Sequence, residues 1–178
     1  MNQEIYLAGG CFWGLEHFLS KIQGVIETEV GYANGEPDIV TYQQVCYNGT
    51  GHAETVRVEY NPDILSLERL LSLYYQAIDP ISVNRQGGDY GIQYRTGIYY
   101  TDPSEQKRIN RSLAELQKHY GQPIAVETAP LKSFCRAEEY HQKYLVKNPH
   151  GYCHISPSKF ILAEQGNRDN RPLDKNNN

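Results

Sequence analysis

Apolar and polar residues follow one another along the chain with two different periods, which divide it into strands and helices. Residues 5–8 form a short apolar run that indicates a strand. The next apolar positions lie three or four residues apart, as on one face of a helix: Leu15, Phe18, Leu19 and Ile22. Alternation returns at residues 26–32 and 53–60, which predicts two strands with one buried face each.

The second half of the chain continues this organisation. Apolar residues at helical spacing predict a helix over 67–78, and residues 94–101 are typical of a strand. The segment 102–121 begins with aspartate, proline, serine and glutamate, a strong start signal for a further helix. A short strand is expected at 124–128 and another helix over 137–146.

The order of these elements is strand-helix-strand-strand-helix-strand-helix-strand-helix, which predicts an α+β fold. We expect a mixed β-sheet flanked by helices, a two-layer sandwich with a ferredoxin-like split βαβ core. A chain of 178 residues suits one domain with a real core, which we expect at 1–163. The polar residues 164–178 are expected to form a disordered tail. The glycine-rich residues 79–93 predict a binding or active-site loop.

Composition and charge narrow the classes of protein. Hydrophobic residues make up 39% of the chain and charged residues 21%, as in an ordinary globular protein. The net charge of −4 argues against nucleic-acid binding, which would need a basic face. The N-terminus has no basic segment and no apolar run could span a bilayer, so we expect a cytoplasmic protein without a membrane partner. The 15 tyrosines suit either a tyrosine-rich core or a hydrogen-bonding cleft.

Four cysteines without a CxxC pair are expected to be free, catalytic or redox-active in a reducing compartment: Cys11, Cys46, Cys135 and Cys153. Cys11 stands at a predicted strand-to-helix turn. The unpaired N–H groups and the dipole at a helix N-terminus favour an anion, so we expect this thiol to ionise more easily than a free one. The alternative is that Cys11 and the two aromatic residues after it, Phe12 and Trp13, are simply core residues.

Glu54 falls on the apolar face of the strand 53–60, together with Val56, Val58 and Tyr60. A buried carboxylate is costly unless it is paired or protonated, so desolvation should raise the pKa of Glu54. The sequence therefore makes Glu54 a candidate proton donor. The alternative is a frayed strand end at which Glu54 meets water.

Single features of the sequence suggest four other kinds of site. A dinucleotide loop at Gly9, Gly10 and Gly14 fails on spacing, because the fingerprint needs glycine where Cys11 stands. A metal site is not expected, because the candidate ligands lack paired cysteines and the helical motif of a catalytic zinc site: His141, His150, Cys153 and His154. A hydrolase with Cys11 and a histidine base, or a redox-sensing module that uses Cys11 as a switch, stays open.

The sequence motifs that accompany Cys11 favour one further option. Five segments, in this order, resemble the motifs of the A-type peptide methionine sulfoxide reductases, the MsrA family: Gly-Cys-Phe-Trp-Gly-Leu-Glu at 10–16, Gly-Thr-Gly-His-Ala-Glu at 49–54, Gln-Gly-Gly-Asp-Tyr-Gly-Ile-Gln-Tyr-Arg at 86–95, Ala-Glu-Glu-Tyr-His-Gln at 137–142 and Asn-Pro-His-Gly-Tyr-Cys at 148–153. The resemblance covers nearly the whole chain up to about residue 163.

The resemblance implies an enzyme, a peptide-methionine (S)-S-oxide reductase, that reduces methionine S-sulfoxide, free or in oxidised proteins, to methionine. Carried over to this sequence, it makes Cys11 the nucleophile and Phe12 and Trp13 the pocket for the S-methyl group. Three side chains would bind the sulfoxide oxygen: Glu54, Tyr42 and Tyr94. Asp89 would support the site from the glycine-rich loop.

The same resemblance implies that Cys11 becomes a sulfenic acid, that Cys153 resolves it to a disulfide, and that thioredoxin reduces this disulfide. No cofactor and no metal are implied, and a monomer is expected. The sequence departs from the family pattern at Cys135, where an aromatic residue is common, and at His154, where a small one is. Cys135 or Cys46 therefore stays open as a substitute for Cys153, although Cys46 is interpreted as structural.

Overall fold

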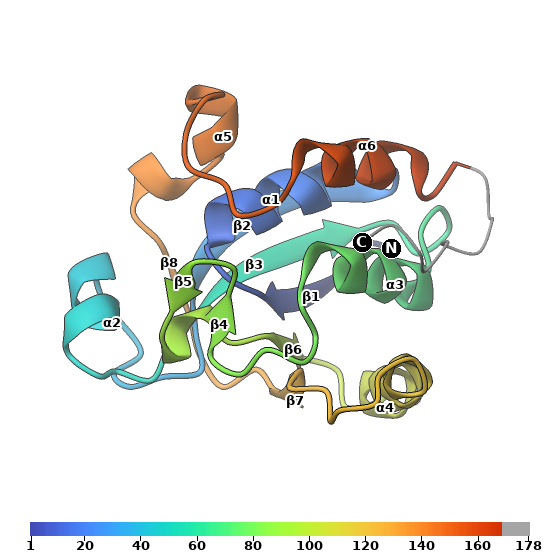
Figure 1. The fold of residues 1–178 in the computed structure, drawn as a ribbon, viewed down its shortest axis with the longest axis horizontal. Helices are drawn as coiled ribbons and strands as arrows, with labels where there is room; N and C mark the ends of the chain where they lie inside the picture. The colour runs from blue at the N-terminus through green and yellow to red at the C-terminus, as the bar shows by residue number, and fades with distance from the viewer. Residues whose placement is uncertain (169–178) are drawn as a thin grey trace.

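A computed structural model describes residues 1–168 and has the split βαβ core that the sequence predicts (Figure 1). The first unit consists of strand β1 (Gln3–Ala8), helix α1 (Phe12–Ser20) and strand β2 (Val25–Ala33). The second consists of β3 (Ala53–Tyr60), α3 (Leu67–Ala77) and β6 (Gly97–Tyr100). Strand β3 inserts antiparallel between β1 and β2, which is the arrangement that splits a βαβ unit.

The main sheet is mixed and consists of six strands in the order β7-β6-β1-β3-β2-β8. The outer strands are β7 (Glu127–Pro130) and β8 (Phe134–Arg136), and among the strand pairs of residues 1–168 only β6–β7 is parallel. Helices α1 and α3 contact each other and α6 (Pro157–Gln165) on one side of the sheet, and α4 (Glu105–Gln117) contacts α3 (Figure 1). The α+β fold class with a mixed sheet flanked by helices is therefore confirmed.

Alternation along the strands separates the two faces of the sheet. Ile5 and Leu7 of β1 point into the main core beneath the helices, whereas Tyr6 and Ala8 belong to a smaller cluster on the opposite face. Strand β3 follows the same rule, because its apolar set joins the main core and places Glu54 on the side of the helices. The burial of this one carboxyl is therefore a consequence of strand period.

Several elements differ from the sequence-based expectation. A short helix α2 (Tyr42–Tyr47), held by a capping box at Thr41, was not predicted. The expected loop 79–93 contains a two-stranded hairpin, β4 (Arg85–Gln86) and β5 (Asp89–Tyr90), and leads into the 3-10 helix η1 (Ile92–Tyr94). Polar and glycine-rich segments carry no hydrophobic period, so their local hydrogen bonding escaped the pattern.

The predicted helix 137–146 is broken in two. A 3-10 helix η2 (Glu139–His141) is separated from α5 (Tyr144–Lys147) by an extended Gln142 and by Lys143, which has a left-handed backbone with φ of 52°. Tertiary contacts of residues 142 and 143 override the helical period at this point.

Near the C-terminus, α6 crosses the boundary expected between residues 163 and 164, and Asn167 still donates hydrogen bonds to the carbonyls of Gln23 and Ile64. The remainder of the expected disordered tail, residues 169–178, lies outside the described residues. No helix within residues 1–168 has the length and apolar character needed to cross a membrane.

Candidate active site

Cys11 lies between β1 and α1, as the sequence predicts, and occupies the N-cap position of the helix. The preceding Gly10 has a φ of 76°, a conformation that favours glycine, and donates its N–H to the carbonyl of Tyr94 at 3.2 Å. This bond ties the turn to η1, which follows the glycine-rich hairpin. The thiol of Cys11 is therefore held between the sheet, the first turn of α1 and the hairpin.

The ionisation of Cys11 corrects the sequence-based expectation. Burial raises the pKa of this thiol well above its ordinary value, and the carboxyl of Glu54 acts in the same direction. A hydrogen bond from the backbone of Trp13 favours the thiolate, as expected at a helix N-terminus, but it is outweighed. Desolvation therefore decides the sign, and the resting side chain is a neutral thiol.

Glu54 is 1% exposed and lies at the start of β3, close to the N-terminus of α1. Its Oε1 accepts a hydrogen bond of 3.1 Å from the backbone N–H of Phe12. Burial raises the pKa of Glu54 to about 8, although the bond from Phe12 opposes that shift. The carboxyl is therefore mostly neutral near pH 7 and is able to donate a proton, in agreement with the sequence-based argument.

Two tyrosines predicted to accompany Glu54 come from segments that surround it. Tyr42 begins α2 and Tyr94 ends η1. Burial raises the pKa of both hydroxyls, and the nearby carboxyl of Glu54 adds to both shifts. The thiol of Cys46 also contributes to the raised pKa of Tyr42, so Cys46 lies nearer the site than its interpretation as a structural residue implied. All these groups are neutral hydrogen-bond donors.

A third tyrosine, Tyr32, was not among the predicted site residues. It is fully buried and stands opposite Glu54 in the register of β2 and β3. Its hydroxyl donates a hydrogen bond of 2.9 Å to Oε1 of Glu138. The other oxygen of Glu138, Oε2, accepts a hydrogen bond from the backbone N–H of Tyr42. Strand alternation already placed Tyr32 on the buried face, but sequence pattern does not show which residue lies opposite it.

The aromatic pair after Cys11 lines one side of the site. Phe12 is 1% exposed and packs against Tyr32 and His141. The half-buried ring of Trp13 stacks on Tyr144, with centroids 3.6 Å apart, and its Nε1 donates to Nδ1 of His141 at 3.0 Å. The motif 137–142 contained His141, but its spacing gave no sign of this contact.

Asp89 connects the glycine-rich hairpin to the segment that carries Cys153. It lies on β5 and accepts a hydrogen bond of 2.9 Å from the hydroxyl of Tyr152. The carboxyl of Asp89 also contributes to the raised pKa values of Cys11 and Glu54. Tyr152 was not predicted to take part in the site, although it belongs to the last of the five motifs.

Cys153 reaches the first turns of α1. A Cβ added at Gly14 would lie 2.9 Å from its Sγ, so only glycine leaves room for the sulfur at this place. Its thiol also interacts electrostatically with that of Cys11, and all four cysteines are free in this structure. The sulfur of Cys135, by contrast, contacts the carbonyl of Val40 at 3.5 Å.

His154 fills the remaining space beside the Cys11 turn. Its Nε2 would lie 2.8 Å from a Cβ added at Gly10, and its Cβ would lie 3.6 Å from one added at Gly87. Burial lowers the pKa of this imidazole, and neither ring nitrogen has a hydrogen-bond partner within residues 1–168. In the same part of the chain, no group of three histidine, cysteine or acidic side chains is arranged to hold a metal ion.

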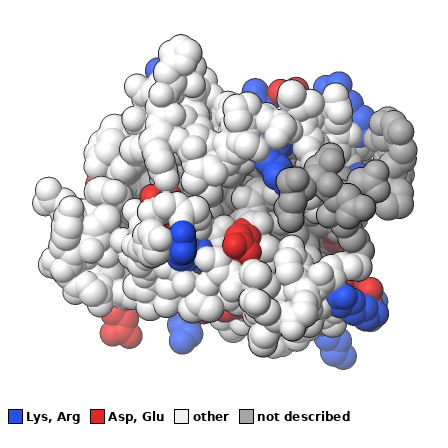
Figure 2. Space-filling model, in the orientation of Figure 1, with Lys and Arg blue, Asp and Glu red and all other residues white. Residues whose placement is uncertain are grey.

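The geometry brings together, in an α+β fold, the kinds of side chain that thiol redox chemistry uses. A buried cysteine at a helix N-terminus lies close to a neutral carboxyl and tyrosine hydroxyls, and a second cysteine stands within reach of the first helical turns. Charged side chains are sparse over α2 on the face seen in Figure 2.

The comparisons with known proteins give the family. The model of the peptide methionine sulfoxide reductase family matches residues 3–170. The chain is 60% identical over 164 residues to a peptide methionine sulfoxide reductase MsrA from Lachnoclostridium phytofermentans, covering 92% of this chain and 99% of that protein. The chain therefore belongs to the peptide methionine sulfoxide reductase family and, like its MsrA relatives, is an enzyme that reduces methionine sulfoxide.

Solved structures agree with this assignment. The reduced form of Mxr1 from Saccharomyces cerevisiae superposes with a TM-score of 0.83 at 39% identity, covering 87% of this chain and 91% of that one. A second structure, of Mxr1 in complex with Trx2, matches with a TM-score of 0.59 at 29% identity, covering 80% of this chain and 84% of that one.

Proposed function

We propose that this enzyme reduces the S-epimer of methionine sulfoxide through a sulfenic acid on Cys11 and a disulfide between Cys11 and Cys153. The observation that carries the proposal is the neutral, buried carboxyl of Glu54 at the N-terminus of the helix that Cys11 caps. Sulfoxide reduction needs both a sulfur nucleophile and an acid, and this pair supplies them.

Activation of the sulfoxide comes first in the proposed mechanism. The sulfoxide sulfur is a poor electrophile until its oxygen is protonated or strongly hydrogen-bonded. Glu54 is the acid, and the hydroxyls of Tyr42 and Tyr94 donate hydrogen bonds to the same oxygen. Because burial raises the pKa of Cys11, its proton leaves only when the substrate sulfur is ready to accept the sulfur nucleophile.

The oxygen then changes sulfur atoms. The sulfur of Cys11 attacks the activated substrate sulfur and forms a sulfur–sulfur bond. The bond between the substrate sulfur and its oxygen then breaks, a bond between that oxygen and the Cys11 sulfur forms, and the sulfur–sulfur bond breaks. Methionine leaves, and Cys11 remains as a sulfenic acid that carries the proton donated by Glu54, while the proton lost by the thiol returns Glu54 to its neutral form. The thiol of Cys153 next attacks this sulfenic acid, forms the disulfide and releases water.

Selectivity for the substrate comes from two groups on its sulfur, the methyl group and the oxygen. Burying one methyl group against Phe12 and Trp13 is worth only about 1 kcal/mol, too little to reject methionine. Methionine would, however, leave the carboxyl and the two hydroxyls without their acceptor, which costs much more. Fixing methyl and oxygen at the same time selects one configuration at sulfur.

Several features support Cys153 as the resolving cysteine. Its sulfur lies against Gly14, three residues from Cys11, and the two thiols interact. Asp89 supports the segment through Tyr152. Thioredoxin is the proposed reductant, because Mxr1, a relative of the same fold, forms a complex with Trx2. Such a reductant suits the predicted cytoplasmic location, and the monomeric state stays a prediction.

A single-turnover experiment tests the proposal. The reduced protein is mixed with separated S- and R-epimers of a methionine sulfoxide peptide, and both methionine formed and thiols lost are counted. We expect about one methionine per protein from the S-epimer alone, with the lost thiols mapped to Cys11 and Cys153. Cys11→Ser should form none. Methionine from neither epimer, or full activity of Cys11→Ser, would contradict the mechanism.

A further inference from the structure

Residues 141–144 contact α1 at two neighbouring positions of the helix. Trp13 contacts His141 and Tyr144 through a hydrogen bond and a ring stack. Three residues further along the helix, Glu16 accepts a hydrogen bond of 2.7 Å from the backbone N–H of Lys143. Residues three apart lie next to each other on a helix, so the contacts of Trp13 and Glu16 form one continuous interface.

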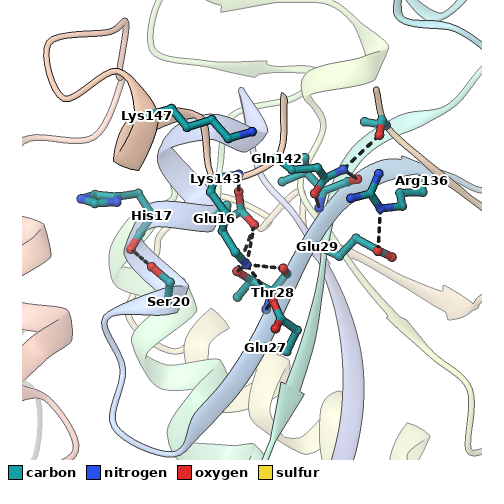
Figure 3. Close-up of polar contacts among 12 residues, drawn as sticks. Glu16, His17, Ser20, Glu27, Thr28, Glu29, Arg136, Gln142, Lys143 and Lys147 are labelled. Atoms are coloured by element: carbon teal, nitrogen blue, oxygen red, sulfur yellow. Dashed lines mark hydrogen bonds and ion pairs between the residues drawn. The ribbon is translucent and has the colours of Figure 1, made fainter. Parts of the chain in front are cut away.

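Glu16 is a buried carboxylate with a full set of partners. It is 2% exposed, and Figure 3 shows it directed from α1 toward Lys143. Besides the backbone bond to Oε1, its Oε2 accepts the hydroxyl of Thr28 at 2.9 Å and lies 3.4 Å from Nζ of Lys143. A carboxylate buried to this degree is tolerated only with such partners, which makes the contact specific for Lys143.

Lys143 is held from both elements that it touches. Its Nζ lies 2.8 Å from Oε1 of Glu27 and also donates to the carbonyl and hydroxyl of Thr28, so that β2 and α1 converge on one ammonium group (Figure 3). Its left-handed backbone is unfavourable for a residue with a side chain and needs compensating contacts. The ion pair with Glu16 is one of them.

Gln142, the residue before Lys143, anchors the same segment to β2. Its side-chain amide pairs with both backbone groups of Val30 on β2, at 3.0 Å to the N–H and 2.9 Å to the carbonyl. With residues 142 and 143 both anchored, the backbone that carries Tyr144 has little freedom. The ring of Tyr144 consequently meets the indole of Trp13 nearly in parallel, with 11° between their planes.

We propose that the Glu16–Lys143 pair is a positioning device that holds Tyr144 against Trp13 and thereby sets the wall of the pocket for the substrate methyl group. The role of the pocket rests on the proposed function, whereas the position of Trp13 is a property of the protein alone. Both residues act through Tyr144 and Trp13. Their loss should weaken substrate binding more than it slows the chemical step.

Trp13 is the single tryptophan of the chain, so its fluorescence reports this contact directly. Lys143→Met removes the charge and keeps the length of the side chain. We expect a red-shifted emission and faster quenching by acrylamide. In single turnover, the half-saturating sulfoxide concentration should rise about five- to tenfold, with the limiting rate within about twofold of the unchanged protein.

Lys147→Met is the matched control, because Lys147 ends α5, the helix that begins directly after Lys143, and within residues 1–168 its Nζ bonds only to Glu139, at distances of 3.0 Å and 4.0 Å. Glu16→Gln keeps the volume of the buried side chain, so it tests the pair even if Lys143→Met does not fold. The double variant should add little to either single change.

The outcomes separate the two proposals. Unchanged fluorescence in both Lys143→Met and Glu16→Gln would overturn the positioning role, whatever the activity. Equal changes in Lys147→Met would overturn it as well, because they would reflect general loosening of α5. Absence of sulfoxide reduction by the unsubstituted protein would instead contradict the proposed function and leave the fluorescence test decisive for the pair.

Discussion

The backbone N–H of Phe12 donates a hydrogen bond of 3.1 Å to Oε1 of Glu54, a residue 42 positions away in the sequence. This bond joins the first turn of the helix that Cys11 caps to the strand that carries the acid. It favours the carboxylate, yet burial still raises the pKa of Glu54 to about 8. Orientation of the acid thus comes from the helix N-terminus, and its proton is retained because water is excluded.

Replacement of the acid is the most direct test of this relationship. Glu54→Gln keeps an acceptor for the N–H of Phe12 but removes the proton that activates the sulfoxide. Loss of a general acid should lower the single-turnover rate about 10²- to 10⁴-fold. Methionine formation is followed in rapid-quench samples, and Glu59→Gln, on the same strand but away from the site, serves as control. A nearly unchanged rate would assign activation to Tyr42 and Tyr94 alone.

The raised pKa of Glu54 predicts how activity depends on pH. The carboxyl must be neutral to donate its proton, and its pKa is about 8. The single-turnover rate should therefore fall as pH rises through that value. The raised pKa of Cys11 keeps its own titration at higher pH. The measurement is a pH profile of methionine formation, and a rate that rises across this range would show that thiolate formation, rather than the acid, controls the step.

The same group links stability to pH. In the folded chain Glu54 binds its proton up to about pH 8, whereas its ordinary pKa is 4.5. Between pH 4.5 and about pH 8 the folded state therefore holds more protons than the unfolded state. The contribution of Glu54 to the free energy of unfolding is complete below pH 4.5 and is lost as pH rises through about 8. Urea unfolding at several pH values should show that Glu54→Gln lacks this part of the decline.

Removal of the resolving thiol should separate the two halves of the reaction. Cys153→Ser should still form about one methionine per protein, since Cys11 alone reaches the sulfenic acid, but it should stop turning over with thioredoxin. Cys46→Ser and Cys135→Ser are the matched controls and should turn over. Continued turnover of Cys153→Ser would show that one of those two cysteines resolves the intermediate.

Gly14 should matter for the disulfide rather than for the first step. A Cβ at this position would lie 2.9 Å from Sγ of Cys153, so Gly14→Ala should displace that sulfur and slow loss of the second thiol. Alanine within a helix otherwise favours stability by up to about 1 kcal/mol. Gly121→Ala, whose Cβ would meet nothing within 4 Å, is the control. Equal disulfide rates in both variants would contradict the placement of Cys153.

The elements with a clear hydrophobic period were predictable, because burial on one face imposes that period. The core strands and helices followed it, as did the buried position of Glu54. The short helix α2 and the hairpin at 85–90 escaped, since they are held by a capping box and by local pairing. The helix expected at 137–146 was wrong because Gln142 and Lys143 bond to β2 and α1 instead of continuing it.

Strand and helix period predicted the elements of the fold, the turn that presents Cys11 and the place of Glu54 on an apolar strand face, because each depends on spacing within one segment. The protonation of Cys11, the contact between Cys153 and Gly14, and the partners of Trp13 became known from the folded structure. Such properties depend on the water excluded and the groups brought close by packing between distant segments. No periodicity within one segment contains that information.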